Sequence, residues 1–217
     1  MMTSSDIEVP GLYIQNDIIS EKLEEKIIDY LNSYEWNTEL SRRTIHQGFK
    51  YPYSGGTSTS LRTRDIRYAN GQGTLIKIDP IVGYLKHLAD YLGENKVMGT
   101  NDQDQPIIPN QVIVNEYTRD QGISAHIDRK DFGPVIVGFS LGEDTNFIFK
   151  DTQSHNKVLL YVPRRSIMIM TGDSRYKWTH EIPKRKTITL DSDGPNRKIE
   201  KKSDNYRRIS ITYRTVL

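Results

Sequence analysis

The residues with the clearest chemical potential lie in the second half of the chain. Two imidazoles and one carboxylate form the ligand set of a non-haem Fe(II) facial triad, which leaves metal positions open for O2 and a co-substrate. Two arginines in one strand are what a dicarboxylate such as 2-oxoglutarate needs for bidentate hydrogen bonds. Both sets together predict an Fe(II)- and 2-oxoglutarate-dependent oxygenase. The residues are His126-Ile127-Asp128, His180 and Arg208-x-Ser210-x3-Arg214.

The spacing of His126 and Asp128 suits a shared metal ion if this segment is a strand. Successive strand residues point to opposite faces, so His126 and Asp128 would share a face and Ile127 would point into the core. A third ligand must come from another strand, and His180 is the best placed. Taken alone, His-x-Asp more often marks a surface pair at a strand end. The other histidines are assigned elsewhere: His46 to an N-terminal cover, His87 to a helix and His155 to a polar turn.

The candidate co-substrate residues occupy the predicted strand 206–216. Arg208, Ser210, Thr212 and Arg214 would share one face of it, opposite an apolar face. Burying two arginines is costly unless an anion compensates them. Six strand residues span roughly 20 Å, so one arginine would bind the far carboxylate and the other would lie nearer the metal. An exposed edge strand with solvated arginines is an equal alternative.

Two helices are expected before these strands. Residues 20–34 carry apolar residues at helical spacing behind the capping residue Ser20. Residues 79–92 form the second helix, with Asp79 as N-cap, Pro80 in the first turn and Gly93 at its end.

From residue 111 the hydrophobic period changes to two. Eight short strands after two helices indicate a jelly roll with the helices packed outside it. The basic and aromatic segment 41–73 is interpreted as irregular hairpins or a mobile cover, and the basic segment 183–205 as a loop or a long hairpin. The expected strands are 111–117, 122–127, 134–141, 145–150, 157–162, 166–171, 176–182 and 206–216.

Composition is that of an ordinary globular protein. The 217 residues are expected to form one domain, with a lid or hairpin region at 41–73 and a jelly-roll core at 110–217. The absence of cysteine, of a long apolar run and of a secretory signal favours an intracellular protein, cytoplasmic or nuclear, that does not enter membranes. A monomer is favoured. The net charge of +2 means that only a local basic patch could bind nucleic acid.

Seven motifs in order resemble the AlkB family of 2-oxoglutarate oxygenases over roughly residues 40–217. They are Arg42-Arg43-x-x-His46-x-Gly48-Phe49-x-Tyr51, Asn115-x-Tyr117, Gly122-Ile123-x3-His126-x-Asp128, Ser140-Leu141-Gly142, Arg165-Ser166, Gly172-Asp173-Ser174-Arg175-Tyr176-x-Trp178-x-His180 and Arg208-x-Ser210-x-Thr212-x-Arg214.

The resemblance implies an α+β, mainly β, double-stranded β-helix with a nucleotide-recognition lid over a flipped or unpaired base. Its cofactors would be Fe(II), held by His126, Asp128 and His180, and 2-oxoglutarate. The residues implied for 2-oxoglutarate are Asn115, Tyr117, Arg208, Ser210 and Arg214. Candidate substrate-binding residues are Arg42, Arg43, His46, Phe49, Tyr51 and Lys130.

Departures from the family pattern bear on the substrate. Bacterial repair members place a tryptophan near the lid position of Arg42 and Arg43, so Phe49 or Tyr51 would have to stack on the base here. Lys130 stands where repair members tend to have an acidic residue. The double arginine and the Arg-Tyr-x-Trp-x-His phrase look more like the branch that includes a tRNA wobble-uridine hydroxylase.

Three hypotheses follow. The first is an oxygenase that hydroxylates or demethylates a modified base in RNA, tRNA or alkylated single-stranded DNA. The second is an oxygenase or demethylase of a protein side chain, whose partner would be an acidic protein. The third, a non-catalytic jelly-roll module, requires an incomplete triad, and the triad is complete in the sequence.

Overall fold

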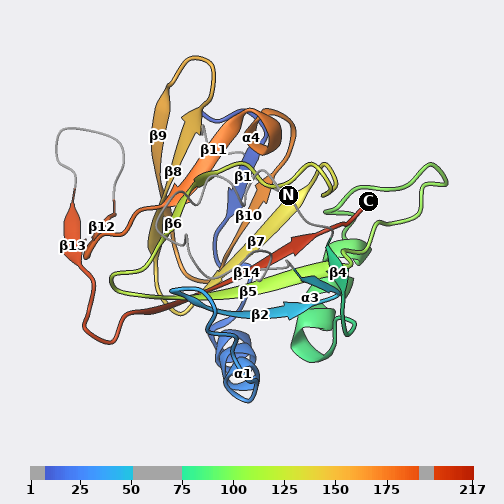
Figure 1. Ribbon diagram of the computed structural model, residues 1–217, viewed down its shortest axis with the longest axis horizontal. Helices are drawn as coiled ribbons and strands as arrows, with labels where there is room; N and C mark the ends of the chain where they lie inside the picture. The colour runs from blue at the N-terminus through green and yellow to red at the C-terminus, as the bar shows by residue number, and fades with distance from the viewer. Residues whose placement is uncertain (1–7, 51–74, 191–197) are drawn as a thin grey trace, which may run out of the picture.

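Two antiparallel sheets face each other in the computed structural model, which describes residues 8–50, 75–190 and 198–217 (Figure 1). The larger sheet has the strand order β1-β10-β7-β14-β5-β2, and the smaller has the order β6-β11-β8-β9. Together they form the expected jelly roll, and a second apolar cluster fills the space between them. The bounds in the larger sheet are β1 Leu12–Gln15, β10 Ser166–Met170, β7 Ile136–Leu141, β14 Arg207–Arg214, β5 Gln111–Thr118 and β2 Arg43–Gln47. Those in the smaller are β6 Ile123–His126, β11 Trp178–Ile182, β8 Thr145–Asp151 and β9 Lys157–Val162.

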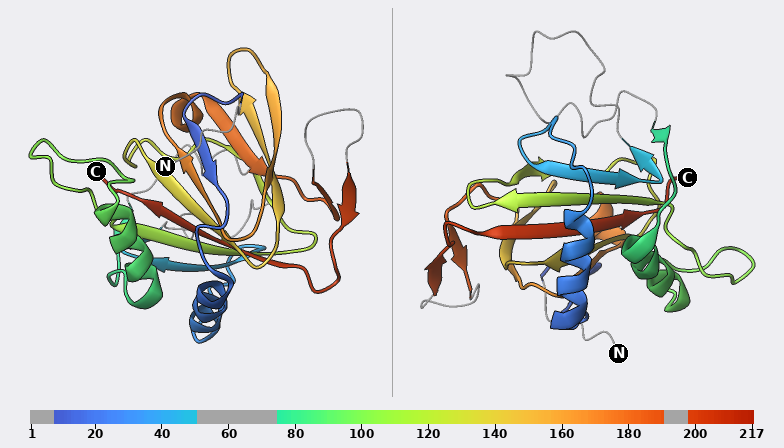
Figure 2. Two further views of the ribbon diagram at one scale, coloured as in Figure 1. Left: turned by 180° about the vertical axis from the view of Figure 1, so that it is seen from behind. Right: turned by 90° about the horizontal axis from the view of Figure 1, so that it is seen from below.

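Two long helices cover the outer face of the six-stranded sheet (Figure 2). Helix α1 spans Glu21–Asn32 and α3 spans Gly83–Glu94. Their buried stripes pack against Val112, Val114 and the apolar face of β14. The helices therefore occupy one face of the sheet and leave the other face to the interior of the barrel.

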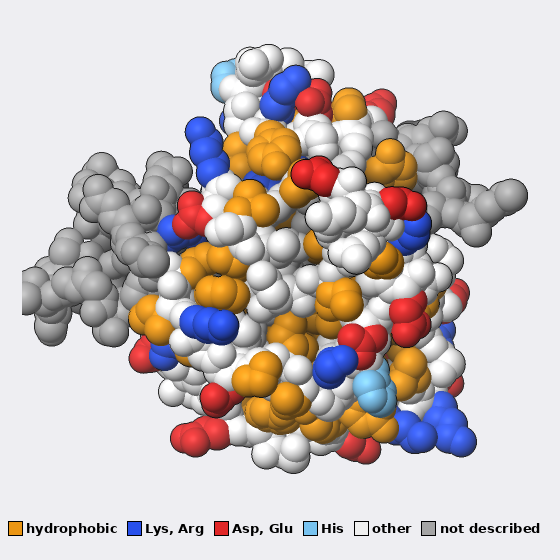
Figure 3. Space-filling view, turned by 90° about the vertical axis from the view of Figure 1, so that its right-hand side faces the viewer, with side chains coloured by type: hydrophobic (Ala, Val, Ile, Leu, Met, Phe, Trp, Pro, Cys, Tyr) orange, Lys and Arg blue, Asp and Glu red, His pale blue; other side chains and the backbone are white. Residues whose placement is uncertain are grey.

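An apolar groove runs between the two helices. Leu23, Ile27, Tyr84, Leu88 and Tyr91 are among its lining residues. Hydrophobic side chains also gather at the lower end of the molecule in Figure 3, where the helices lie. The groove contains one histidine, His87, and no Asp, Glu, Lys or Arg among its described lining residues, so it offers no metal or anion chemistry.

The start of α1 is confirmed and that of α3 is wrong. The Ser20 side chain accepts a hydrogen bond from the backbone N–H of Leu23 at 3.3 Å, as a capping residue does. Helix α3 begins at Gly83 instead of near Asp79, because the Asp79 carbonyl is bound by the N–H of Gly48 at 2.7 Å. The Asp79 carbonyl, which an N-cap residue would use for the first hydrogen bond of the helix, is thus paired with a distant segment. The helix also continues through the buried Gly93 to Glu94.

The eight expected strands from residue 111 onwards are all present, with small shifts at their ends. The unexpected elements include the edge strand β1 and the short helix α4 (Gly172–Tyr176), whose last residue is the predicted start of the strand 176–182. Strands β12 (Thr187–Thr189) and β13 (Ile199–Lys201) pair antiparallel, so the segment 183–205 is a long hairpin in its described part.

The proposed cover 41–73 is described only at its beginning. There it contains β2 and the short strand β3 (Phe49–Lys50), which pairs with β4 (Ile76–Lys77). Tyr51 lies outside the described residues. No helix in the described part of the chain is long and apolar enough to cross a membrane.

Candidate metal and co-substrate site

The three expected metal ligands meet at the mouth of the barrel. His126 ends β6 and lies opposite His180 of β11, with 4.3 Å between their ring centroids. His126 Nε2 lies 3.8 Å from Asp128 Oδ1, and one ligand atom from each of the three residues lies within 4.8 Å of the others. This is a compact set of two nitrogens and one oxygen, as a facial triad requires.

The route by which Asp128 reaches the site differs from the expectation. Strand β6 ends at His126, so Asp128 does not share a strand face with it, and Ile127 is partly exposed instead of lying in the core. Asp128 belongs to the turn after β6. Its position therefore depends on side chains that hold this turn.

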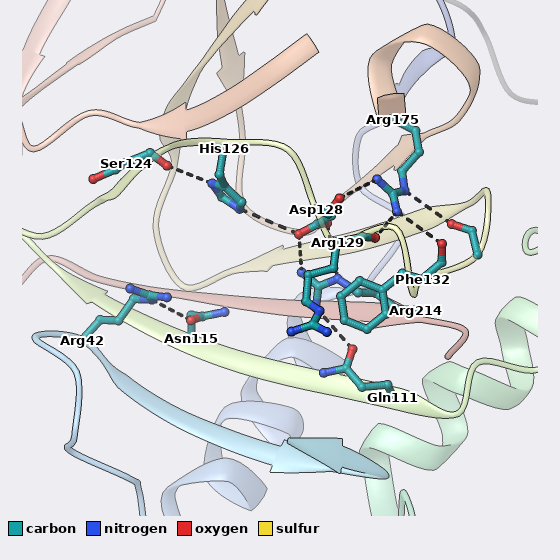
Figure 4. Close-up of polar contacts among 11 residues, drawn as sticks. Arg42, Gln111, Asn115, Ser124, His126, Asp128, Arg129, Phe132, Arg175 and Arg214 are labelled. Carbon is teal, nitrogen blue, oxygen red and sulfur yellow. Dashed lines mark hydrogen bonds and ion pairs between the residues drawn. The ribbon is translucent and has the colours of Figure 1, made fainter. Parts of the chain in front are cut away.

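Arg175 holds the turn from inside. The residue is 2% exposed, and its guanidinium donates to the backbone carbonyls of Asp128 at 3.0 Å, Arg129 at 2.6 Å and Phe132 at 3.3 Å (Figure 4). Helix α4 presents this arginine. The sequence contains it within the motif that ends at His180, but nothing local to Arg175 shows that it would bind carbonyls.

Arg214 holds the Asp128 carboxylate. Its Nε lies 3.3 Å from Oδ2 and its Nη2 lies 3.2 Å from Oδ1, while Nη1 donates to Gln111 at 3.2 Å (Figure 4). Burial by itself would raise the pKa of Asp128, but Arg214, His180 and His126 together hold that pKa well below its usual range. Asp128 is thus an anion, the form in which a carboxylate binds a metal.

Both histidines are suited to be neutral ligands. The Nδ1–H of His126 donates to the Ser124 carbonyl at 2.8 Å, which leaves the lone pair on Nε2, the nitrogen nearer Asp128. Burial, and then the neighbouring His126, lower the pKa of His180 to about 3. Nδ1 of His180 is buried without a hydrogen-bond partner among the described residues. An ionised carboxylate and two neutral imidazoles fit a divalent cation.

Arg208 is a buried cation that forms no ion pair with any described residue. It is 2% exposed, its Nε donates to Ser140 Oγ at 3.0 Å, and Nη1 has no partner among the described residues. The rings of Tyr117 and Phe147 lie 5.6 Å and 5.4 Å from the guanidinium carbon. Burial lowers the pKa of Arg208, because the surrounding side chains remove its charge from water. An unpartnered guanidinium N–H in an aromatic pocket fits a ligand carboxylate.

One pocket joins the metal ligands to these polar residues. Arg208 and Arg214 both line it, and Arg214 also binds Asp128, one of the expected metal ligands. Apolar side chains such as Met168 and Met170 complete its wall. All eight residues expected to bind the metal and 2-oxoglutarate line it: Asn115, Tyr117, His126, Asp128, His180, Arg208, Ser210 and Arg214. Their individual roles remain predictions.

The candidate substrate residues do not all lie on the side of the pocket. The Arg42 Nε donates to Asn115 at 2.8 Å, and His46 lies opposite Ile113, on the barrel side of β2. Burial, then Arg214, lowers the pKa of His46 to about 4, so it is neutral near pH 7. Phe49 is half-buried in β3, and Lys130 is exposed in the turn after Asp128.

Arg43 is directed away from the pocket. It lies opposite Glu116, on the helix side of the sheet, and binds that carboxylate at 2.6 Å and 2.7 Å. The register of β2 on β5 decides this, because neighbouring residues of a strand face opposite sides. Arg43 is not placed where it could contact a substrate in this pocket.

Comparisons with known proteins agree with the site. A family profile described as "2OG-Fe(II) oxygenase superfamily" matches residues 11–214. Uncharacterized protein L905 of Acanthamoeba polyphaga mimivirus is 30% identical over 211 residues, which are 95% of this chain and 85% of that protein.

Two further relatives are longer than this chain. The mouse protein named tRNA (carboxymethyluridine(34)-5-O)-methyltransferase ALKBH8 is 30% identical over 189 residues, 83% of this chain. The Arabidopsis thaliana protein named alkylated DNA repair protein ALKBH8 homolog is 26% identical over 234 residues, 99% of this chain. The chain spans 25% of the length of the first and 61% of the second.

Solved structures share the fold. OsALKBH1 superposes with a TM-score of 0.57 at 18% identity, covering 95% of this chain and 98% of its own. A 2OG-Fe(II) oxygenase family oxidoreductase from Burkholderia pseudomallei gives a TM-score of 0.57 at 10% identity, covering 94% and 83%. The profile match, the relatives and the triad agree: the chain belongs to the 2OG-Fe(II) oxygenase superfamily and is an AlkB-like dioxygenase that depends on Fe(II) and 2-oxoglutarate.

Proposed function

We propose that this oxygenase hydroxylates or oxidatively demethylates a modified base in nucleic acid, with RNA favoured over alkylated single-stranded DNA. The observation that carries the proposal is a set of basic side chains beside the pocket. Arg42 binds Asn115, which lines the pocket, and exposed Lys184 and Arg185 follow Ile182, another lining residue. Cations around a pocket bind phosphates of a strand whose base enters it.

The assignment of residues to roles is part of the proposal. His126, Asp128 and His180 hold Fe(II), and Arg208 binds the far carboxylate of 2-oxoglutarate. When bound, Fe(II) and 2-oxoglutarate would supply the chemistry by which O2 hydroxylates a C–H bond, with 2-oxoglutarate converted to succinate and CO2. Arg214 keeps Asp128 ionised and in place. An N-methyl group hydroxylated in this way is lost as formaldehyde, whereas a hydroxyl on a stable side chain remains.

Two features support RNA. The relatives with the ALKBH8 name include one described by a tRNA uridine activity. Basic Lys130 occupies the turn beside Asp128, so the entrance has no acidic side chain at that position to read an exocyclic amine. We also propose that segment 41–73 forms the lid over the base and that the chain is a single domain.

The test loads the protein with Fe(II) and 2-oxoglutarate without oxygen and then measures succinate on adding O2. The additions are tRNA, methylated single-stranded DNA, an acidic protein extract freed of nucleic acid, or nothing. Succinate formation stimulated by tRNA supports the proposal. Stimulation by the protein extract alone would instead indicate that the substrate is a protein side chain. Asp128→Ala must abolish all succinate, since it removes a metal ligand.

A charge-matched pair tests the basic surface. Lys184→Ala with Arg185→Ala should weaken tRNA binding several-fold and make it less dependent on salt. Lys22→Ala with Lys26→Ala removes the same charge from exposed positions of α1, on the helix side of the molecule. If both pairs weaken tRNA equally, binding is non-specific and the proposed surface is wrong.

A further inference from the structure

Arg42 contacts a residue that lines the co-substrate pocket. Arg42 immediately precedes β2, an edge strand of the large sheet, and Asn115 lies in the adjacent strand β5. Nε of Arg42 lies 2.8 Å from Oδ1 of Asn115 (Figure 4). Asn115 is 6% exposed and lines the pocket. Arg42 is partly exposed and forms no ion pair within the described part of the chain.

The two ends of an asparagine amide are not equivalent. Oδ1 only accepts hydrogen bonds, and Nδ2 only donates them. A guanidinium only donates, so Arg42 can bind Asn115 through Oδ1 alone. In the flipped orientation two donors would face each other beside a positive charge. The contact therefore selects one orientation of Asn115 and leaves its NH2 group as the end free to donate elsewhere.

That orientation suits an anion in the pocket. Asn115 pairs in register with Ser210 of β14, and Arg208 lies two residues from Ser210 on the same face. Together the three side chains supply hydrogen-bond donors to a carboxylate. If Asn115 were flipped, Oδ1 would instead oppose the negative charge. Whether Asn115 attracts or repels a bound carboxylate thus depends on which end of its amide faces Arg42.

We propose that Arg42 is a positioning residue for 2-oxoglutarate: by holding Oδ1 of Asn115 it presents the Asn115 NH2 group to the co-substrate carboxylate. The role is distinct from contact with a nucleic-acid phosphate, since it acts when no substrate is present. It also joins the first residues of the proposed lid to the co-substrate site. Binding of 2-oxoglutarate and the position of Arg42 are then linked.

Arg43 provides a matched control. It is the next residue, it has the same side chain, and it lies on the other face of the sheet in a bidentate pair with Glu116. Arg43→Met removes the same charge from the adjacent position without touching the pocket. Any general effect of losing an arginine from this strand should appear in both variants.

The experiment titrates 2-oxoglutarate into the Fe(II)-loaded protein without oxygen or nucleic acid and follows the visible absorption of the chelate. Arg42→Met should raise the Kd about fivefold to tenfold, as expected for a hydrogen bond that orients a donor to a charged group. Arg43→Met should leave the Kd unchanged, and Fe(II) affinity should be the same in both. Arg42→Lys, which keeps a donor and the charge, should recover most of the affinity.

A double-mutant cycle decides whether Arg42 acts through Asn115. In an Asn115→Ala background, Arg42→Met should cause no further rise in Kd. An undiminished effect in that background would overturn the proposal, as would equal effects of Arg42→Met and Arg43→Met. The shift in unfolding temperature caused by 2-oxoglutarate gives a second readout, and apo unfolding temperatures show whether each variant is folded.

Discussion

Replacing Arg208 with methionine should have opposite effects on the empty protein and on co-substrate binding. Arg208 is buried, its guanidinium lies near the rings of Tyr117 and Phe147, and its Nε donates a hydrogen bond to the neutral Ser140 hydroxyl. Its Nη1 has no partner within the described residues. Methionine is apolar and flexible enough to pack between the two rings. The substitution removes a buried charge that the empty protein does not compensate.

The expected magnitudes follow from these contacts. Removing an incompletely bonded buried cation should raise the free energy of unfolding of the empty protein by about 1 kcal/mol. Loss of a buried charge pair with the ligand should cost about 3 kcal/mol of binding, or roughly a 100-fold increase in Kd for 2-oxoglutarate. At 100 times the wild-type Kd, 2-oxoglutarate stabilises wild type by about 2.7 kcal/mol and the variant by about 0.4 kcal/mol.

The assay is thermal unfolding with Mn(II), which accepts the same ligands as Fe(II) without oxidising. For a chain of this length, 2-oxoglutarate should raise the unfolding temperature of wild type by about 5–10 °C and that of the variant by roughly 1 °C. A destabilised apo variant would show that Arg208 is compensated in the empty protein. An unchanged 2-oxoglutarate shift would refute its assignment to the carboxylate.

Three further predictions concern residues that support the site or the sheet. Arg175→Lys should weaken metal binding about tenfold to a hundredfold, measured by titration with Mn(II), since one ammonium cannot replace a guanidinium that holds several carbonyls of the Asp128 turn; unchanged metal affinity would contradict the positioning role. Burial opposes ionisation of Glu116, but its two arginine partners lower its pKa below 4.5. The ionised carboxylate therefore stabilises the protein above that pH, and this stabilisation is lost as the pH falls through the lowered pKa. In Glu116→Gln the free energy of unfolding, measured by urea titration at several acidic pH values, should fall less steeply with falling pH than in wild type; an equal fall in both proteins would contradict this. Glu24→Ala should lower the free energy of unfolding by about 1–3 kcal/mol in urea titration, because this fully buried carboxylate binds the Gly142 N–H at 2.8 Å, which would lose its partner, and the partly exposed Arg164; a loss below about 0.5 kcal/mol would show that these contacts contribute little.

The period of two in residues 206–216 was enough to predict which side chains of β14 share a face. Arg208, Ser210 and Arg214 line the pocket, and Ile209 and Ile211 pack against the helices. This alternation is a property of any extended strand and needs no tertiary information. The ligand types, two imidazoles and a carboxylate, likewise restrict the chemistry before any fold is known.

Pairing between distant segments was needed to separate Arg42 from Arg43. Both residues look equivalent in sequence, but the register of β2 on β5 sets Arg43 opposite Glu116 and Thr44 opposite Asn115. Arg42 therefore lies on the face of Asn115 and binds its side chain, whereas Arg43 binds Glu116 on the other face. A shift of one residue would exchange them. The same kind of competition moved the start of α3, where the Asp79 carbonyl binds Gly48 instead of beginning the helix.

The candidate metal site shows most clearly what the sequence determines and what depends on the tertiary structure. The sequence by itself determined the candidate ligands and the polar face of β14, since both depend on residue type and short-range periodicity. Only the tertiary structure decided how Asp128 reaches the histidines, because it follows the end of β6 in a turn that Arg175 and Arg214 hold from 47 and 86 residues away. Such long-range hydrogen bonds leave no local pattern, so they emerge only when the chain has folded.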